Sequence, residues 1–407
     1  MSYKKLGEYI QVIDDRNRDL LDLPLLGVSV QKVFIPSIAN TVGTDMSKYK
    51  ILSKNQFTYI PDTSRRGDKI GVALLKNHEK ALVSQAYTTF KIIDEEKLNP
   101  DYLMMWFSRP EFDRYARYHS IGSVREVFDW TDMCEVELPI PSIEKQREIV
   151  AQYEAVANKI KVNEAICEKL EATAQALYKQ WFVDFEFPVS DTEALVSDTE
   201  ALEVSGVASS ASATRGYKSS GGTMVFNEEL EKEIPEGWEV GKLETVSNLK
   251  YGKMLDSDKF LDSGFPVFSG YGVRGYYSEY MYEKEQILVL CRGVSGTGEV
   301  RLSPKFSYIT NLSIVVEIQE DVMKKFFTYY YLKNDDLKSL DSGSAQSMIT
   351  TGDLYFRDIL IPNFLIQLQF EEQILKLHNC KESLKEQNQK LTQLQSLLLS
   401  RLATLEG

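Results

Sequence analysis

The sequence predicts an α+β chain in which two mixed α/β blocks are separated by two long helices that pair as an antiparallel coiled coil. Three features of the sequence predict this arrangement. One segment occurs twice in the 407 residues, each copy belongs to a block with short strand-like runs, and a long heptad pattern follows each copy. We therefore expect an internal pseudo-two-fold repeat.

The repeat is visible without any gap. The segment GSVREVFDWTDMCEVELPIP, residues 122–141, aligns with GSAQSMITTGDLYFRDILIP, residues 343–362, at an offset of 221. An aromatic segment precedes each copy, YLMMWF at 102–107 and FFTYYYL at 326–332. Both aromatic segments have the pattern of amphipathic helices near the end of a block.

Short apolar or β-branched runs predict strands in both blocks. They are residues 69–75 and 82–93 in the first block and residues 286–292 and 311–318 in the second. The glycine-rich segment 293–298 lies between two strand patterns. A phosphate-binding loop needs a helix directly after it, so we expect a hairpin or loop here instead.

Each block is followed by a long helical pattern, at 142–187 and at 363–407. Apolar positions alternate at spacings of four and three, which is the seam of a coiled coil. The first seam is Ile149, Tyr153, Val156, Ile160, Asn163, Cys167, Leu170, Ala174, Leu177 and Trp181. The second seam is Phe370, Ile374, Leu377, Lys381, Leu384, Asn388, Leu391, Gln395, Leu398 and Leu402.

An isolated helix with such a stripe is unstable in water, so the two seams are expected to pack on each other. If they overlap fully and run antiparallel, Asn163 faces Asn388. A buried asparagine pair can fix the register of a coiled coil at some cost in stability. The alternative is that each asparagine is exposed at the edge of its helix.

The predicted segments divide the whole chain. They are the first block at 1–141, the first helix at 142–187, a linker at 188–233, the second block at 234–362 and the second helix at 363–407.

The formal net charge of −13 is unevenly distributed. Residues 188–233 contain 3 basic and 9 acidic residues, a net charge of −6, and their composition is that of a linker or a poorly ordered crossing. Inside this segment VSDTEAL occurs twice in tandem, at 189–195 and 196–202. The duplication is either low-complexity drift or a unit that sets the length of the connector. The two blocks are only weakly acidic, so each of them can still have a local basic face.

Catalytic and metal-binding patterns are missing from the sequence. The three histidines and four cysteines do not stand at ligand spacings, and no GxxxxGK[ST] phosphate loop occurs. The segment from Asn99 to Tyr102, NPDY, is expected to start a helix with Asn99 as the cap and Pro100 in the first turn. No run of 18 apolar residues and no signal peptide are present, so a cytoplasmic protein is expected.

Several segments resemble the specificity subunit of Type I restriction–modification systems. They are LPIPSIEKQREIV at 138–150, WFVDFEFP at 181–188, IPEGWEVGKL at 234–243, GYGVRGYYSEY at 270–280 and RGVSGTG at 292–298. The resemblance covers the whole chain. It departs from the family at PNFLIQLQFEEQI, residues 362–374, where the usual PxxEQ form is blurred.

The resemblance implies a non-catalytic subunit whose two blocks are target-recognition domains. Each domain would read one half of a bipartite, asymmetric site on double-stranded DNA, in the major groove. The helices would set the half-site spacing and dock two modification subunits, which bind S-adenosylmethionine and methylate adenine. Restriction subunits would supply translocation and cleavage with ATP and Mg. No cofactor is expected in this chain.

The residues expected to touch DNA are cationic or polar side chains beside turns and in the repeated loop, where Arg suits guanine and phosphate and Gln or Ser suits adenine or phosphate. In the first domain they are Arg65, Arg66, Lys69, Ser123 and Arg125. In the second domain they are Lys253, Arg274, Tyr276, Arg292, Ser344 and Gln346. Each of them is alternatively an ordinary solvated surface residue.

Two other classes of function compete with this hypothesis. A coiled-coil scaffold that binds proteins fits the weakly acidic blocks, while the family-like segments argue against it. An enzyme is disfavoured by the missing catalytic patterns. Because the net charge is negative, we expect the chain to bind DNA weakly alone and to rely on basic partner subunits.

Overall fold

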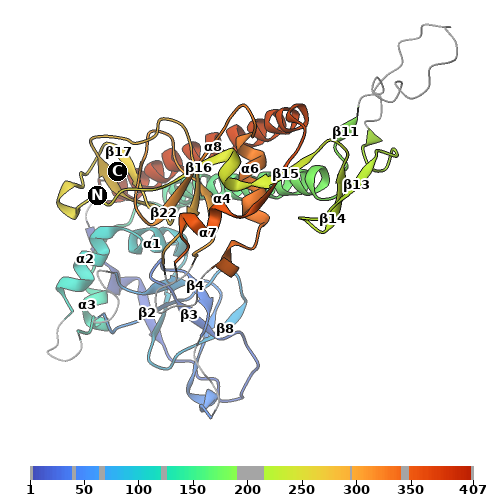
Figure 1. Ribbon diagram of the computed structural model, residues 1–407. Coiled ribbons are helices and arrows are strands. Elements are labelled where there is room, and N and C mark those ends of the chain that lie inside the picture. The colour runs from blue at the N-terminus through green and yellow to red at the C-terminus, as the bar shows by residue number, and fades with distance from the viewer. Residues whose placement is uncertain are drawn as a thin grey trace, which may run out of the picture. The chain divides into compact units, whose positions relative to one another are not determined.

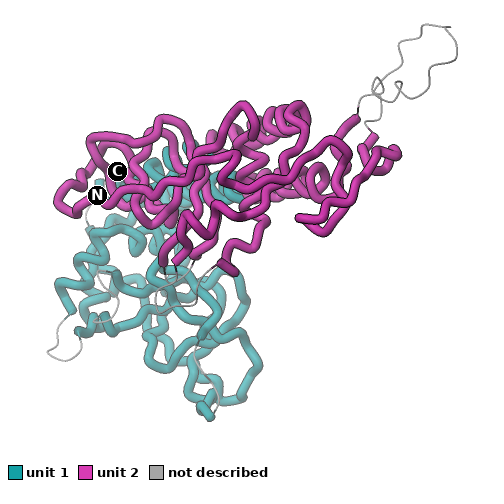
Figure 2. Tube along the Cα trace, in the orientation of Figure 1, with its two compact units in different colours: residues 1–165, 384–407 teal, residues 166–383 magenta. Residues whose placement is uncertain are grey.

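The computed structural model describes residues 3–38, 43–63, 69–120, 126–189, 215–293, 296–340 and 348–404. It divides into two compact units, coloured separately in Figure 2. Unit 1 consists of residues 1–165 and 384–407, and unit 2 consists of residues 166–383. The division passes through both long helices, so each unit contains a part of each helix. The predicted segments, which keep each helix whole, remain a prediction of the domain organisation.

Unit 1 is built on a four-stranded antiparallel sheet in the order β2–β9–β6–β7. Figure 1 labels the strand β2 of this sheet. Its strands are Ile10–Ile13 (β2), Thr88–Ile92 (β9), Phe57–Tyr59 (β6) and Val72–Leu74 (β7). The other strand pairs are β1 (Tyr3–Lys5) with β10 (Glu137–Pro139), β3 (Leu26–Val28) with β4 (Phe34–Pro36), and β5 (Lys50–Ser53) with β8 (Lys80–Val83). The short helices are α1 (Pro100–Phe107), α2 (Pro110–Tyr118) and α3 (Trp130–Cys134).

Unit 2 is built on an equivalent four-stranded antiparallel sheet, in the order β16–β22–β19–β20. Its strands are Ser247–Tyr251 (β16), Ser313–Ile318 (β22), Ile287–Leu290 (β19) and Val300–Leu302 (β20). A second sheet joins β18 (Val273–Tyr277), β17 (Phe265–Phe268) and β21 (Tyr308–Ile309), and β15 (Glu239–Lys242) pairs with β23 (Asp358–Ile361). The short helices are α5 (Leu243–Val246), α6 (Lys325–Asn334) and α7 (Thr351–Tyr355).

Both aromatic segments form the helices that the sequence predicts, α1 and α6. Asn99 caps α1, since its side chain accepts a hydrogen bond from the backbone N–H of Tyr102 at 3.0 Å, and Pro100 occupies the first turn. The predicted strand run 82–93 is two strands, β8 and β9, because a turn at residues 84–87 interrupts it.

The repeat in sequence is a repeat in structure. The backbone N–H of Phe128 donates to the carbonyl of Pro61 at 3.0 Å, and the N–H of Ile349 donates to the carbonyl of Cys291 at the same distance. Phe128 and Ile349 are 221 residues apart, the offset of the sequence repeat. Each hydrogen bond ties the repeated segment to the end of the third strand of its sheet, so the two units share one architecture.

A fully buried glutamine anchors the start of each long helix. In unit 1, the Gln146 side chain accepts from the N–H of Asn99 at 2.8 Å and donates to the carbonyls of Lys97 and Pro141 at 2.9 and 2.8 Å.

In unit 2, Gln367 makes the equivalent bonds to Lys324, Val322 and Pro362 at 2.9, 3.2 and 2.9 Å. The second helix start therefore retains the function of this position, although its sequence pattern is blurred.

The two long helices are α4 (Ile143–Phe182) and α8 (Phe364–Arg401). None of the twenty predicted seam side chains is exposed. In unit 1 the partners run in opposite directions, since Ile149 shares a core cluster with Leu402. In unit 2 the Trp181 ring lies 5.8 Å from that of Phe370. The antiparallel pairing is therefore confirmed in the part of the helices that each unit contains.

The predicted asparagine pair is present. The Asn163 side chain is fully buried and donates to Asn388 Oδ1 at 2.8 Å and to Gln387 Oε1 at 2.6 Å. The Asn388 amide donates in turn to the carbonyl of Ile160 at 3.3 Å. Sliding one helix past the other would leave these buried groups unpaired, so the pair disfavours other registers.

The first long helix ends at Phe182, five residues before the predicted end at 187. Phe185 adopts a left-handed backbone conformation with φ of 59°, which breaks the helix. Phe185 and Phe187 are both buried in the core of unit 2. Burial of these aromatic rings drives the chain out of the helix.

The predicted linker 188–233 is ordered in its described part. The strand Pro188–Val189 (β11) pairs with Arg215–Gly216 (β12), and Met224–Asn227 (β13) pairs with Lys232–Pro235 (β14). Apart from Val189, the VSDTEAL tandem lies outside the described residues.

Within unit 2, two ionic clusters connect the short helix α6 to the long helices. Glu171 of α4 accepts from Lys333 of α6 at 2.6 Å and from Lys381 of α8 at 2.7 Å. Burial alone would raise the pKa of Glu171, but the hydrogen bonds from the two lysines outweigh it and lower the pKa to about 2.

The second cluster joins Glu285, which precedes β19, to His378 of α8 at 2.9 Å and to Lys325 of α6 at 3.0 Å. Burial acts to raise the pKa of Glu285 here as well, and its two partners bring the pKa down to about 2. Both clusters thus connect α6 with α8. The first uses Lys333 near the C-terminal end of α6, and the second uses Lys325 at its N-terminal end.

We predict that Gln146→Ala destabilises the chain by about 1–3 kcal/mol, because it leaves a buried N–H and two carbonyls without their partner. Gln152→Ala, at an exposed amide of the same helix, is the matched control and is expected to change stability by about 0.5 kcal/mol or less. Urea unfolding checks both variants, and equal midpoints would contradict the anchoring role.

We also predict an acid-sensitive contribution to the stability of unit 2. Glu171 and Glu285 titrate lower in the folded chain than their ordinary value of 4.5. Their stabilisation is therefore complete above about pH 4.5 and is lost as the pH falls towards 2. Thermal unfolding between pH 7 and 3 should show a smaller acid slope for Glu285→Gln than for the wild type. Glu372→Gln, at an exposed position of α8, should keep the wild-type slope.

Candidate nucleic-acid interface

One end of the four-stranded sheet in each unit carries predicted DNA contacts, Lys69 in unit 1 and Lys253 and Arg292 in unit 2. We call it the loop end. In unit 1 it comprises residues 59–63, 69–72, 84–88 and 126–128, and in unit 2 it comprises residues 251–254, 290–293, 298–300, 310–313 and 348–351. The two loop ends are equivalent, because corresponding strands end there.

In unit 1, two residues that flank predicted DNA contacts lie side by side. The backbone N–H and the hydroxyl of Thr63 both donate to the carbonyl of Glu126, at 3.0 and 3.2 Å. Thr63 directly precedes residues 64–68, and Glu126 directly follows residues 121–125. The predicted contacts in these two segments are outside the described residues, and they stay predictions. They are Arg65, Arg66, Ser123 and Arg125.

The fifth predicted residue of unit 1, Lys69, is exposed at the loop end. The next residue is held firmly, since the N–H of Ile70 donates to the Asp113 carboxylate at 3.1 Å. Asp113 also pairs with the buried Lys32 at 2.8 Å. Burial lowers the pKa of Lys32, against the opposing effect of Asp113. Ile70, which follows Lys69, is therefore anchored to the buried ion pair of Asp113 and Lys32.

In unit 2, Arg292 takes the place that Asp62 has in unit 1. Arg292 forms an isolated bridge with Met348, as Asp62 does with Val127. Its guanidinium lies 6.0 Å from the ring of Tyr251, and its Nε is buried without a hydrogen-bond partner among the residues that the structure describes. The predicted Ser344 and Gln346 precede Met348 and lie outside the described residues.

The predicted Lys253 is exposed and lies beside a turn at residues 310–313. Its N–H donates to the carbonyl of Ile309 at 2.9 Å, and the N–H of Gly252 donates to that of Ser313 at 3.0 Å. A side chain at Gly252 would place its Cβ 2.2 Å from the carbonyl oxygen of Thr310, so only glycine permits this close approach. The chain around Lys253 is thus packed tightly on the turn.

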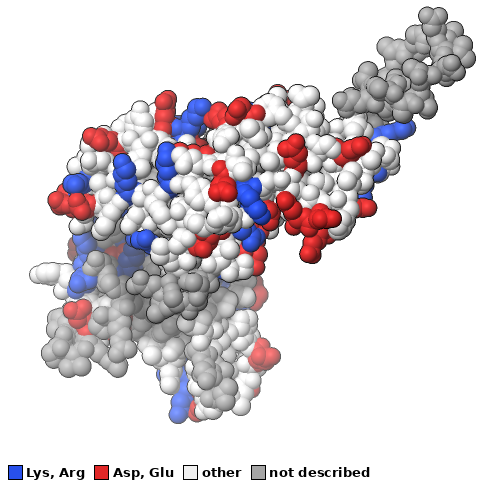
Figure 3. All heavy atoms as spheres, viewed as in Figure 1, with Lys and Arg blue, Asp and Glu red and all other residues white. Residues whose placement is uncertain are grey.

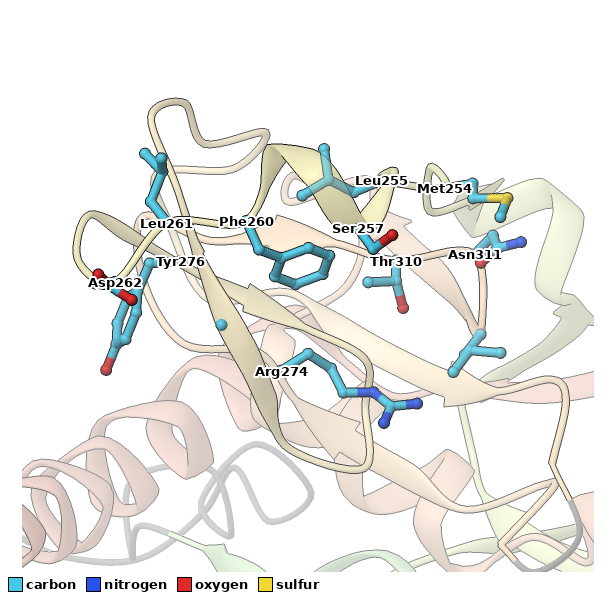
Figure 4. Close-up of a pocket in the computed structure, with 12 residues that line it drawn as sticks. Met254, Leu255, Ser257, Phe260, Leu261, Asp262, Arg274, Tyr276, Thr310 and Asn311 are labelled. Atoms are coloured by element: carbon cyan, nitrogen blue, oxygen red, sulfur yellow. The ribbon is translucent and has the colours of Figure 1, made fainter.

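Arg274 and Tyr276 line a hollow of about 780 Å³ in unit 2 (Figure 4). Both side chains belong to β18, and the lining also includes Phe260, Thr310 and Asn311. Figure 4 shows Arg274 extending beneath Phe260 towards the side of Thr310 and Asn311. The structure therefore brings two predicted residues together and adds an aromatic ring and two polar side chains that the sequence did not indicate.

The loop from Gly293 to Gly298 connects β19 and β20, which pair antiparallel. The expected hairpin is thus confirmed. No cluster of three metal-ligating side chains occurs among the described residues. Within the same part of the chain, no helix is long and apolar enough to cross a membrane.

Charge does not separate on the visible face of unit 2. Lys and Arg are interspersed there with Asp and Glu (Figure 3). Electrostatic attraction by this face is consequently weak, as the net charge of −13 indicates.

The fold has two units of equivalent architecture, and each contains a part of both long helices. Residues 18–172 and 235–393 match the family described as Type I restriction modification DNA specificity domain. The chain belongs to this family, as a specificity subunit, which is a non-catalytic component of a Type I restriction–modification complex.

Two curated relatives agree with this family. The specificity subunit of the Type I restriction enzyme HindI from Haemophilus influenzae is 26% identical over 368 residues, covering 77% of this chain and 79% of the relative. That of MjaIX from Methanocaldococcus jannaschii is 31% identical over 165 residues, covering 40% of this chain and 30% of the relative. The crystal structure of an S subunit from M. genitalium shares the fold, with a TM-score of 0.57 at 16% identity, covering 100% of this chain and 96% of that one.

We predict that Asp113→Ala destabilises unit 1 by about 3–5 kcal/mol, because the buried Lys32 loses its counter-charge. Glu8→Ala, at an exposed carboxylate of the same unit, is the control and is expected to have little effect. Chemical unfolding measures both. If the two variants unfold alike, Asp113 does not hold this loop in place.

Proposed function

We propose that each unit reads one half of a bipartite, asymmetric site on double-stranded DNA and that its loop end enters the major groove. The single observation that supports this best is the duplication of the loop end on equivalent sheets. Two readers of one architecture suit a site of two half-sites, and base edges in the major groove distinguish all four base pairs.

Asymmetry of the site follows from the side chains at equivalent positions. Asp62 in unit 1 corresponds to Arg292 in unit 2. A carboxylate accepts a hydrogen bond from cytosine, whereas a guanidinium donates to guanine or to phosphate. The two half-sites therefore differ in base sequence.

The long helices set the distance between the half-sites and dock two modification subunits. An exposed apolar row on α8 supports the docking, because Leu365, Leu368 and Leu375 are 63%, 38% and 43% exposed. Large apolar side chains grouped on a helix surface are typical of a protein interface. The modification subunits bring S-adenosylmethionine, and restriction subunits bring ATP and Mg. The complex acts on DNA in the cytoplasm.

The experiment is to map methylated bases in DNA from a host that expresses this chain with its modification partner. The proposal expects one asymmetric motif of two halves separated by a fixed gap. A motif without a gap, or none at all, would contradict it.

A protein-binding scaffold is the second candidate, because the visible face of unit 2 shows no basic patch (Figure 3). A mobility-shift assay on mixed-sequence duplex, with and without the modification subunit, separates the two functions. A DNA reader gives salt-sensitive binding that strengthens with the partner present. A scaffold gives no salt-sensitive binding in either case.

We predict that Arg292→Ala in the complex weakens binding to the specific duplex by about 1–3 kcal/mol and relaxes one position of one half-site. Lys284→Ala is the matched control, since Lys284 is an exposed cation beyond the opposite end of the same sheet. Competition binding against single-base variants of the site measures both effects. An equal loss on every sequence would mean that Arg292 contacts phosphate and reads no base.

A further inference from the structure

We propose that Gln85 in unit 1 and Asn311 in unit 2 each read an adenine in their own half-site. The inference deepens the proposed function and depends on it, since it identifies one base and one side chain in each half of the site. It assigns a role to two residues that occupy the same position in the two units.

The two residues lie in equivalent turns. In unit 1 the N–H of Tyr87 donates to the carbonyl of Ser84 at 3.1 Å, and in unit 2 the N–H of Ser313 donates to the carbonyl of Thr310 at 3.3 Å. The first turn leads directly into β9, and the second overlaps the start of β22, the equivalent strand.

The pairing of the strands gives the correspondence residue by residue. Thr88 of β9 pairs with Tyr59, and Ile314 of β22 pairs with Val289. Both units share a hydrogen bond from the repeated segment, which the carbonyl of Pro61 accepts in unit 1 and that of Cys291 accepts in unit 2. Tyr59 and Val289 each stand two residues before that carbonyl. Thr88 therefore corresponds to Ile314, an offset of 226. With this offset, Ser84 corresponds to Thr310 and Gln85 corresponds to Asn311. Both turns therefore contain a hydroxyl side chain followed by a carboxamide side chain.

Both carboxamides have hydrogen-bonding capacity to spare. Gln85 is exposed, and Asn311 is half-buried on the wall of the hollow in Figure 4. Neither side chain has a hydrogen-bond partner within the described ranges. Beside Asn311, the Thr310 hydroxyl is buried, and it also lacks a partner in that part of the chain. A ligand that supplies both a donor and an acceptor would satisfy these groups.

Adenine presents that combination in the major groove. Its N6 amino group donates and its N7 accepts, and a carboxamide pairs with both at once. Guanine offers two acceptors there and cytosine one donor, so neither gives a carboxamide two good bonds. The same side-chain chemistry at the same position in both units thus indicates the same base in both half-sites.

The structure holds the two turns ready for this contact. In unit 2 the turn is fixed by the N–H of Cys291, which donates to the carbonyl of Leu312 at 3.0 Å, and by the close approach of Gly252. In unit 1 the Ser84 hydroxyl accepts from the N–H of Ala86 at 3.3 Å. A carboxamide on a rigid turn loses little freedom when it binds, which favours selective contacts.

The first experiment maps the methylation motif of the complex with three variants. Gln85→Ala should lose preference for one adenine in one half-site, and Asn311→Ala should do so in the other half-site. The expected loss of discrimination at that position is roughly 5- to 140-fold, which corresponds to about 1–3 kcal/mol for one bidentate contact. Gln286→Ala is the matched control, because its amide precedes β19 at the opposite end of the sheet, and it should leave the motif unchanged.

The second experiment changes the DNA first, so its initial measurement uses the wild-type protein. Wild-type complex is tested by competition binding on duplexes in which one adenine at a time is replaced by 7-deazaadenine, which lacks the N7 acceptor. One replacement in each half-site should weaken binding. Asn311→Ala, or Asn311→Asp if the alanine variant does not fold, should become insensitive to the replacement in its own half-site alone.

The outcomes separate this inference from the proposed function. Position-specific loss in one half-site for each variant supports it. An unchanged motif, an equal loss on all sequences, or indifference of the wild type to 7-deazaadenine overturns it, while a wild-type bipartite motif leaves the proposed function standing. If the wild type itself yields no bipartite motif, both fall together.

Discussion

The rest of the structure depends on the burial of one carboxamide at the start of each long helix. Gln146 and Gln367 each bind one N–H and two carbonyls that come from the end of a block and from the entry to its neighbouring helix. Leaving such a group unpaired in a core costs about 1–3 kcal/mol. The direction in which a helix leaves its sheet is therefore determined by hydrogen bonds, and the loop end of that sheet takes its orientation relative to the start of the helix from the same bonds.

The features that the sequence predicted correctly are those that follow from periodicity and from local chemistry. The heptad seams follow from spacing, and the Asn163–Asn388 contact follows once the seams are taken to overlap fully and to run antiparallel. The cap of the first aromatic helix at Asn99 is local as well.

What the sequence could not show is the equivalence of residues 84–87 and 310–313. The gapless repeat has an offset of 221, whereas this turn has an offset of 226, and the strands between them are too short to align by pattern. Only the hydrogen bonds between strands reveal it.

The charge of the chain and its architecture favour cooperation with partners. Six of the thirteen excess negative charges lie in residues 188–233, outside the segments that form the loop ends. The visible face of unit 2 mixes both signs (Figure 3), and such a face gives little long-range attraction for DNA. Under the proposed function, short-range contacts at the loop ends would supply selectivity, and other subunits of the complex would supply most of the affinity. A subunit of this kind would not be trapped on unrelated DNA before it is assembled.

The composition of unit 1 also determines the order in which the chain can complete its fold. Leu402 is buried in the core of unit 1, and the Tyr3 hydroxyl donates to the carbonyl of Ala403 at 2.7 Å. Unit 2 is continuous in sequence, whereas unit 1 lacks part of its core until residues 384–404 have been synthesised. At roughly 5–20 residues per second, the interval between Ala165 and Leu402 is on the order of 10–50 s. During synthesis the second recognition unit therefore closes first, and the first unit waits with part of its apolar core exposed to chaperones or to partner subunits.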